Sequence, residues 1–211
     1  MCVSPAGNSV EYHLKLLVIG ESGAGKTSII NRLCNNVFLT NYKATIGIDF
    51  ALYILQINDN TTVRLHLWDI AGSERYGQMT RVYYKEAAGA LIVYDATKSN
   101  WSEGVTKWKK DLDDKITQKD GKPLPTLLLA NKCDLESAKA PDAATLTASN
   151  LPECILTSAK TDIGITDAIT SIVRQILATG NHQPYQTAPE HTVQLTIDPL
   201  PKTTSSSSCT C

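Results

Sequence analysis

Gly20-Glu21-Ser22-Gly23-Ala24-Gly25-Lys26-Thr27 follows directly on the apolar run Leu14–Ile19. The eight residues fit G-x-x-x-x-G-K-[ST], the pattern of a loop that wraps a triphosphate. Glycines let backbone N–H groups approach phosphate oxygens without a Cβ in the way, and the helix that follows adds its positive end. Lys26 is expected to reach the β- and γ-phosphates, and the Thr27 hydroxyl is expected to hold Mg²⁺. The sequence therefore predicts a nucleoside triphosphate site.

Length and composition point to one globular domain. The chain has 211 residues, of which 42% are hydrophobic and 19% charged, enough for a domain of roughly 170 residues with a tail. The formal net charge of −1 argues against nucleic-acid binding by bulk charge. No run approaches the roughly eighteen apolar residues of a membrane span. Cys2, Cys34, Cys133 and Cys154 lack zinc spacing, so we expect reduced thiols.

Strand-like and helix-like segments alternate along residues 13–177, which predicts an α/β fold with a six-stranded, mostly parallel sheet and helices on both faces. The expected strands are Leu14–Ile19, Phe50–Ile57, Thr62–Trp68, Ala90–Tyr94, Leu127–Ala130 and Cys154–Thr157. Asn58-Asp59-Asn60 predicts a hairpin between the second and third strands. We expect residues 1–12 to be a flexible arm. Residues 178–211 are rich in Thr, Ser, Pro and Gln, which predicts a disordered tail.

The base of the nucleotide is indicated by Asn131-Lys132-Cys133-Asp134, which follows the strand candidate Leu127–Ala130 at the carboxyl end where α/β sheets bind ligands. The Asp134 carboxylate can accept hydrogen bonds from N1–H and the 2-amino group of guanine. Adenine would leave a buried carboxylate unpaired, which disfavours an ATP-using kinase. Ser158-Ala159-Lys160 can offer a backbone N–H to guanine O6, and the stems of Lys132 and Lys160 can flank the ring.

Two further segments are expected to sense the γ-phosphate. Asp69-Ile70-Ala71-Gly72 ends a strand, so Asp69 would hold Mg²⁺ through a water and the Gly72 N–H would contact the γ-phosphate. Thr45 lies in the loop before Ile48, where its hydroxyl could complete the Mg²⁺ shell only when the γ-phosphate is present. We therefore expect these loops to order with GTP and to relax after hydrolysis.

These motifs resemble those of a Rab-type small GTPase of the Ras superfamily, over residues 14–177 and again at the C-terminus. Thr45–Phe50 and Trp68–Gly72 resemble the two switch segments of Rabs. Within Rabs, Arg81–Ala87 and Lys107–Asp113 are similar to the subgroup numbered thirty-two and thirty-eight, which is associated with lysosome-related organelles. The resemblance implies a P-loop NTPase G domain over residues 13–177.

The resemblance also implies a set of site residues. Phe38 matches the aromatic residue at the guanine edge. The implied nucleotide-binding residues are Gly20, Ser22, Gly23, Ala24, Gly25, Lys26, Thr27, Ser28, Phe38, Thr45, Gly72, Asn131, Lys132, Asp134, Ser158, Ala159 and Lys160, with Thr27, Thr45 and Asp69 for Mg²⁺. Phe50, Trp68 and Tyr83 match the aromatic triad that presents nucleotide state to effectors, and Ile46, Gly47 and Ile48 join them in the implied effector surface.

The family implies partners as well. These are GTP-dependent effectors, an exchange factor, a GTPase-activating protein, the Rab escort protein and the GDP-dissociation inhibitor, bound by a monomer that contacts no nucleic acid. Cys209 and Cys211 form a terminal C-x-C that resembles the Rab signal for double geranylgeranylation. Two lipid chains are enough to anchor a protein stably to a membrane. We therefore expect the protein on the cytoplasmic face of intracellular membranes, with a cytosolic pool.

Ser73 departs from the family pattern. In W-D-x-A-G-Q-E the glutamine orients the attacking water, but Ser73 follows Gly72 here. The expected catalytic set is therefore Lys26, Gly72 and Ser73, with slow intrinsic hydrolysis and unimpaired nucleotide binding. The activators of the family are thought to supply both an arginine and a glutamine in trans. Ser73 therefore does not forbid GTP hydrolysis that an activator stimulates. The alternative is a membrane scaffold that stays nearly always in the GTP state.

Overall fold

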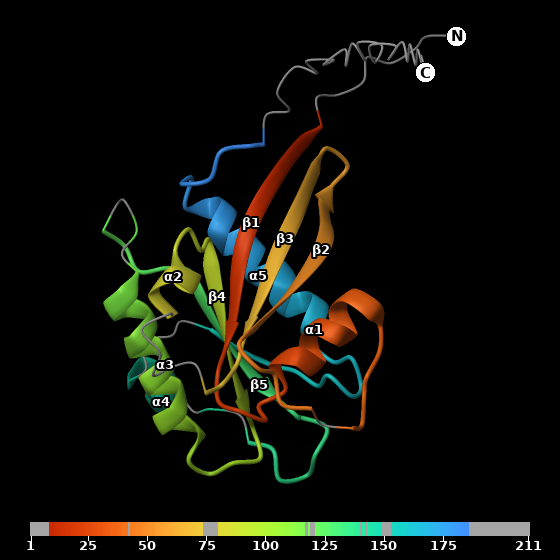
Figure 1. Ribbon diagram of the computed structural model, residues 1–211, viewed down its shortest axis with the longest axis vertical. Helices are drawn as coiled ribbons and strands as arrows, with labels where there is room; N and C mark the ends of the chain where they lie inside the picture. Colours follow the sequence, from red (N-terminus) through yellow and green to blue (C-terminus); the bar gives the residue numbers. More distant parts are fainter. Residues whose placement is uncertain are drawn as a thin grey trace, which may run out of the picture.

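The computed structural model describes residues 9–41, 43–73, 80–116, 118, 121–139, 141, 143–148 and 153–185. The strands are β1 (Val10–Ile19), β2 (Ile48–Asn58), β3 (Thr61–Ile70), β4 (Gly89–Asp95), β5 (Thr126–Asn131) and β6 (Cys154–Leu156). The helices are α1 (Lys26–Asn35), α2 (Thr80–Tyr84), α3 (Trp101–Lys115), α4 (Ala143–Ala148) and α5 (Ile165–Ala178). Figure 1 shows the long β1 and β3 side by side in the sheet.

Within these residues six strands form one sheet in the order β2-β3-β1-β4-β5-β6. Every neighbouring pair is parallel except β2 and β3, which are antiparallel. The turn Asp59-Asn60 joins β2 to β3. Such a tight turn can connect only antiparallel neighbours, which agrees with the direction of this pair. The predicted six-stranded α/β sheet and its hairpin are confirmed.

Helices cover both faces of the sheet, with α1 and α5 on one side and α2 and α3 on the other (Figure 1). Side chains of the central strands alternate between the two apolar cores. In β1, Leu16 and Val18 join the α1/α5 core, whereas Leu17 and Ile19 join the core under α3. Burial on both faces explains why the central strands read as continuous apolar runs. Because β3, β1, β4 and β5 are mutually parallel, their carboxyl ends lie along one edge of the sheet.

The predicted N-terminal arm is wrong over its last residues, because β1 begins at Val10. Val10–Tyr12 pair with Thr61–Val63 of β3, which extends the central strand beyond its purely apolar part. Tyr12 packs against the α1/α5 core, whereas Glu11 and His13 face the other side. The alternation of apolar and polar residues from Val10 to Leu14 was the available signal. Residues 1–8 lie outside the described residues.

The predicted tail also starts later than residue 178. Helix α5 ends at Ala178, and the chain beyond it is described as far as Tyr185. The Tyr185 backbone N–H donates to the Glu11 carbonyl at 2.6 Å, and its ring stacks on His13 with a centroid separation of 4.3 Å. These contacts use a stretch of β1 that β4 does not pair. Residues 186–211, with Cys209 and Cys211, lie outside the described residues. Among the described helices none has the length and apolar character needed to span a bilayer.

Candidate nucleotide site

A cavity of about 850 Å³ opens at the edge where β1, β3 and β5 end. Its walls come from the loop before α1, the loop between α1 and β2, and the loops after β3, β5 and β6. Most predicted nucleotide residues line it: Ser22, Gly23, Gly25, Lys26, Thr27, Ser28, Phe38, Thr45, Gly72, Asn131, Lys132, Asp134, Ala159 and Lys160. Segments far apart in the sequence therefore meet at one site, as the motif order predicted.

The loop before α1 is held closed by its own lysine. Lys26 is only 6% exposed, and its ammonium donates to the carbonyls of Gly20 and Glu21 at 3.0 and 3.1 Å. Burial lowers the pKa of Lys26, whereas the nearby charges of Asp69 and Glu21 raise it. A phosphate group in the cavity would supply a further, stronger partner for this buried charge.

At two positions of the site only glycine fits, because neighbouring loops approach the backbone too closely for a Cβ. A Cβ on Gly25, whose φ is 96°, would lie 2.2 Å from the Asn131 amide nitrogen. A Cβ on Gly72 would lie 2.3 Å from the Ser22 backbone nitrogen. Any side chain at either position would push the loops apart. The loop after β3 can therefore pack directly against the phosphate loop.

Three oxygen-bearing side chains converge where the sequence predicts Mg²⁺. The Thr27 and Thr45 hydroxyls lie 2.8 Å apart, and the Thr27 hydroxyl also donates to one carboxylate oxygen of Asp69. Asp69 is 2% exposed, and its other oxygen is buried without a partner among the described residues. Burial raises the pKa of Asp69, against the effect of the Thr27 hydrogen bond and the Lys26 charge.

This arrangement fits a hard divalent cation, which prefers hydroxyl and carboxylate oxygens. The unpartnered Asp69 oxygen is the observation that decides the fit, because a buried carboxylate oxygen is costly unless something binds it. No cluster of three or more His, Cys, Asp or Glu side chains in the described part of the chain could hold a metal. The candidate magnesium site thus depends on the two threonines as much as on Asp69.

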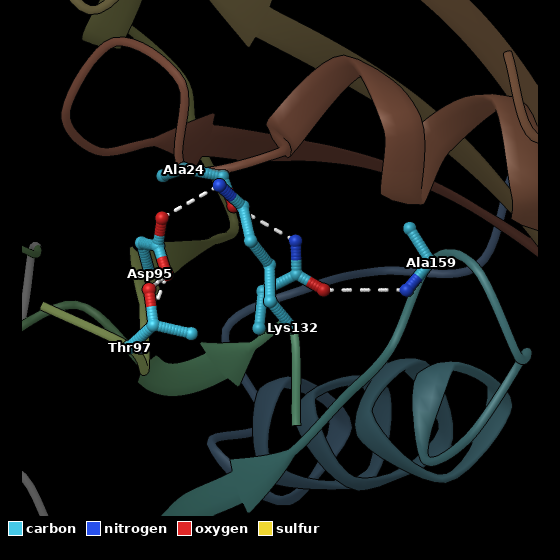
Figure 2. Close-up of polar contacts among 6 residues, drawn as sticks. Ala24, Asp95, Thr97, Lys132 and Ala159 are labelled. Carbon is cyan, nitrogen blue, oxygen red and sulfur yellow. Dashed lines mark hydrogen bonds and ion pairs between the residues drawn. The ribbon is translucent and has the colours of Figure 1, made fainter. Parts of the chain in front are cut away.

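On the base side of the cavity, Asp134 is held by Ser158. The Ser158 hydroxyl donates to the Asp134 carboxylate at 2.6 Å and accepts from the Thr161 backbone N–H at 3.1 Å. Asn131 joins the two neighbouring loops: its amide NH₂ donates to the Ala24 carbonyl at 2.8 Å, and its carbonyl oxygen accepts from the Ala159 N–H at 3.2 Å (Figure 2). The loop after β6 and the phosphate loop are therefore fixed to the end of β5.

Lys132 is oriented by a carboxylate that the sequence analysis did not single out. Its ammonium pairs with Asp95 at 2.6 Å, and Asp95 also accepts from the Thr97 hydroxyl and N–H (Figure 2). Lys132 adopts a φ of 68°, a left-handed conformation uncommon outside glycine. Asp95 ends β4 at the ligand edge of the sheet, and that position was the signal that could have identified it.

Three predicted residues lie behind the cavity wall rather than in it. Gly20 and Ala24 are buried members of the phosphate loop, and their carbonyls accept from Lys26 and Asn131. Ser158 is fully buried and reaches the cavity only through Asp134. Ser73 is exposed and lines the cavity beside Gly72, at the place predicted for a group near the γ-phosphate.

The predicted effector residues lie next to the cavity, where two of them are well exposed and the other four are half-buried. Ile46 is 94% exposed and Phe50 is 61% exposed. Phe50 meets Trp68 edge to face, with ring centroids 4.5 Å apart, and Lys15 lies 3.4 Å from the centre of the Trp68 ring. Tyr83 packs, half-buried, against the core under α3. Gly47, whose carbonyl accepts from the Ala71 N–H at 3.0 Å, links this group of residues to the loop after β3.

Comparison with known proteins agrees with these motifs. The sequence model of the Ras family matches residues 15–178. The chain belongs to the Ras family. Human Ras-related protein Rab-32 is 48% identical over 186 residues, covering 86% of this chain and 82% of its own length. Rab-32A of Dictyostelium discoideum is 45% identical over 214 residues, covering 94% of each. Human Rab-7L1 is 48% identical over 127 residues, or 60% of this chain and 63% of its own length.

The predicted resemblance to Rabs, including the thirty-two/thirty-eight subgroup, is therefore confirmed. The chain is a small GTPase of the Rab type, a class of GTP-binding switches in vesicle trafficking. Ras-family proteins bind GTP or GDP with Mg²⁺, and the converging Thr27, Thr45 and Asp69 oxygens agree with that expectation.

Proposed function

We propose that the cavity binds GTP and GDP with Mg²⁺ through the residues named above, and that this Rab-type switch hydrolyses GTP slowly because Ser73 replaces a glutamine. The observation that carries the proposal is the meeting, in one cavity, of the Lys26 loop, the Asp134–Ser158 pair and the three oxygen side chains. Phosphate, base and metal would each find the groups that their chemistry needs.

Each part of the cavity binds a different part of the ligand. Lys26 and the N-terminus of α1 stabilise phosphate charge, and Asp134 accepts from the N1–H and the 2-amino group of guanine. Thr27 and Thr45 supply hydroxyl ligands for the metal. Bound Mg²⁺ would neutralise charge on the β- and γ-phosphates. Thr45 and Gly72 lie on the two loops around the γ-phosphate position, so loss of that group would release both loops.

Ser73 limits the chemical step in this proposal. A glutamine amide can both donate to and accept from the attacking water, whereas a serine hydroxyl is shorter and lacks the paired amide groups. Ser73 is exposed at the cavity, so a glutamine there would have room to reach the water. Nucleotide binding does not need that residue, because the other cavity walls supply the phosphate and base contacts.

A second function is favoured by the same residue. A protein with very slow turnover would stay loaded with GTP and act as a membrane scaffold. Single-turnover GTP hydrolysis with and without a cell extract separates the two. The switch predicts strong stimulation by an activator in the extract, whereas the scaffold predicts persistent GTP in both samples.

We further propose that Ile46, Gly47, Ile48, Phe50, Trp68 and Tyr83 bind GTP-dependent effectors, because they adjoin the loops that sense the γ-phosphate. An exchange factor, a GTPase-activating protein, the escort protein and the GDP-dissociation inhibitor would act on a monomer. Geranylgeranyl groups on Cys209 and Cys211 would hold it on the cytoplasmic face of intracellular membranes, with a cytosolic pool.

Competition for the loaded nucleotide tests the base contacts. Unlabelled GTP should displace labelled GDP from the Mg²⁺-loaded protein at far lower concentration than ATP. Equal displacement by the two would contradict the proposed role of Asp134.

A further inference from the structure

Arg32, in the last turn of α1, hydrogen-bonds to two loops that the nucleotide motifs do not connect. Its Nε donates to the Ala159 carbonyl at 2.9 Å, and one terminal nitrogen donates to the Lys160 carbonyl at 3.1 Å. The other terminal nitrogen donates to the backbone oxygen and the side-chain oxygen of Asn36, at 3.0 and 2.9 Å. One guanidinium therefore fixes both the loop after β6 and the residue that ends α1.

These contacts set the direction of the Lys160 N–H. In a trans peptide the N–H points away from the carbonyl of the preceding residue. Because Arg32 holds the Ala159 carbonyl, the Lys160 N–H faces the opposite side of the loop, away from α1. The neighbouring amides are already used, since Ala159 N–H donates to Asn131 and Thr161 N–H donates to Ser158. Lys160 lines the cavity, and its N–H has no partner among the described residues.

The other end of the guanidinium reaches the start of the loop that carries Phe38 and Thr45. Asn36 caps α1 in a left-handed conformation with φ 53°, and its N–H donates to the Arg32 carbonyl at 3.0 Å. Two residues later Phe38 lines the cavity and packs against the α1/α5 core. A displacement of this loop start would therefore pull on the hydrogen bonds that hold Ala159 and Lys160.

We propose that Arg32 is the positioning residue for guanine O6: it clamps the Ala159 and Lys160 carbonyls so that the Lys160 N–H faces the base, and it ties this loop to Asn36. The inference rests on the proposed function, since it assigns a support to the same nucleotide site. Arg32 itself contacts no nucleotide atom in this assignment. Its loss should weaken the contact to O6 and leave the Asp134 contacts to the other guanine edge in place.

The test compares nucleotide release from full-length protein loaded with Mg²⁺ and one of two diphosphates. GDP carries O6, whereas 6-thioguanosine diphosphate has sulfur, a weaker acceptor, in place of O6 and keeps both N1–H and the 2-amino group that Asp134 is proposed to bind. The variants are Arg32→Ala, Arg32→Lys, which keeps the charge without the fork of donors, and Arg174→Ala, an exposed arginine of α5 as control. Thermal unfolding of each loaded variant checks that it is folded.

We expect Arg32→Ala to speed GDP release roughly ten-fold, because the lost hydrogen bonds are charged but partly exposed. Release of 6-thioguanosine diphosphate should change by less than about two-fold, since its sulfur accepts only a weak hydrogen bond from the Lys160 N–H. Arg32→Lys should fall between wild type and Arg32→Ala, and Arg174→Ala should match wild type. A merely structural arginine would speed the release of both nucleotides equally, and that result, or no change for GDP, overturns the inference.

The proposed base contacts and the proposed role of Arg32 would fail in different ways. If wild type releases GDP and 6-thioguanosine diphosphate at the same rate, the loop after β6 does not bind O6 and the proposed base contacts are wrong. If wild type discriminates between them and Arg32→Ala discriminates equally well, only the role of Arg32 is wrong. Should Arg32→Ala fail to fold, the same comparison on Arg32→Lys decides the question.

Discussion

Ser158 donates a 2.6 Å hydrogen bond to Asp134 from a loop that follows a different strand of the sheet. The bond holds one carboxylate oxygen of Asp134, while the other remains available to the cavity that Asp134 lines. Because Ser158 is fully buried, this orientation is protected from competing water. Base recognition therefore depends on the packing of the loop after β6 as well as on Asp134.

Asp134→Asn should change which base is bound. An amide can donate to the 2-oxo group of xanthine, whereas the carboxylate accepts from the 2-amino group of guanine, so preference should shift toward xanthine nucleotides. Competition of XDP and GDP for the Mg²⁺-loaded protein measures the shift. A variant that loses affinity for GDP without any gain for XDP would show that Asp134 is structural.

Thr45→Ala should weaken Mg²⁺ in the GTP complex only. The Thr45 hydroxyl lies 2.8 Å from that of Thr27, and we assign it to the metal when the γ-phosphate is present. The Mg²⁺ concentration needed to slow GTP release should rise roughly ten-fold, equivalent to about 1.4 kcal/mol, whereas that for GDP should not move. Thr166→Ala, at an exposed threonine of α5, is the matched control. An equal rise for GDP would contradict the assignment.

Asp95 should make stability sensitive to acid. Burial pushes the pKa of Asp95 up, but the hydrogen bonds from Lys132 and Thr97 outweigh it and hold the pKa below its ordinary value of 3.8. A lowered pKa gives stability that is present above the unfolded value and lost as pH falls through the folded value. Unfolding by urea between pH 6 and pH 3 should therefore show a shallower loss of stability in Asp95→Asn than in wild type. If wild type and Asp95→Asn lose stability identically as the pH falls, the Asp95–Lys132 pair contributes nothing to the free energy of unfolding.

The sequence predicted the sheet and most of the cavity, because their signals are local. The loop Gly20–Thr27 and the run Asn131–Asp134 each match a short motif, their order along the chain makes the pair specific, and strand ends place both at one edge. Arg32 could not be found in this way, since its partners Ala159 and Lys160 lie 127 and 128 residues away and carbonyl acceptors leave no sequence pattern. The start of β1 was missed because polar residues interrupt the apolar run.

Replacing both Cys209 and Cys211 by serine should leave the domain folded and GTP-binding but move it to the cytosol. Among the described residues the core runs from Tyr12 to Leu177, and we expect a polar tail to add nothing to the stability of the fold. Fractionation of cells that express the double variant, beside one in which Ser207 and Ser208 are changed to alanine, measures the effect. Double-serine protein that stays on membranes would reveal another anchor.

Ser73→Gln tests the proposal that Ser73 slows intrinsic GTP hydrolysis. Intrinsic hydrolysis by wild type should be roughly ten- to a hundred-fold slower than by Ser73→Gln, about 1.4 to 2.7 kcal/mol of barrier. GTP affinity should barely change, since the residue contacts the attacking water more than the bound triphosphate.

Single-turnover hydrolysis of preloaded GTP by wild type and Ser73→Gln, with bound nucleotide quantified in both, is the most direct test. We expect faster hydrolysis by Ser73→Gln than by wild type at equal GTP occupancy. Equal rates would contradict this expectation, and would mean that another group orients the water or that loop motion limits the reaction.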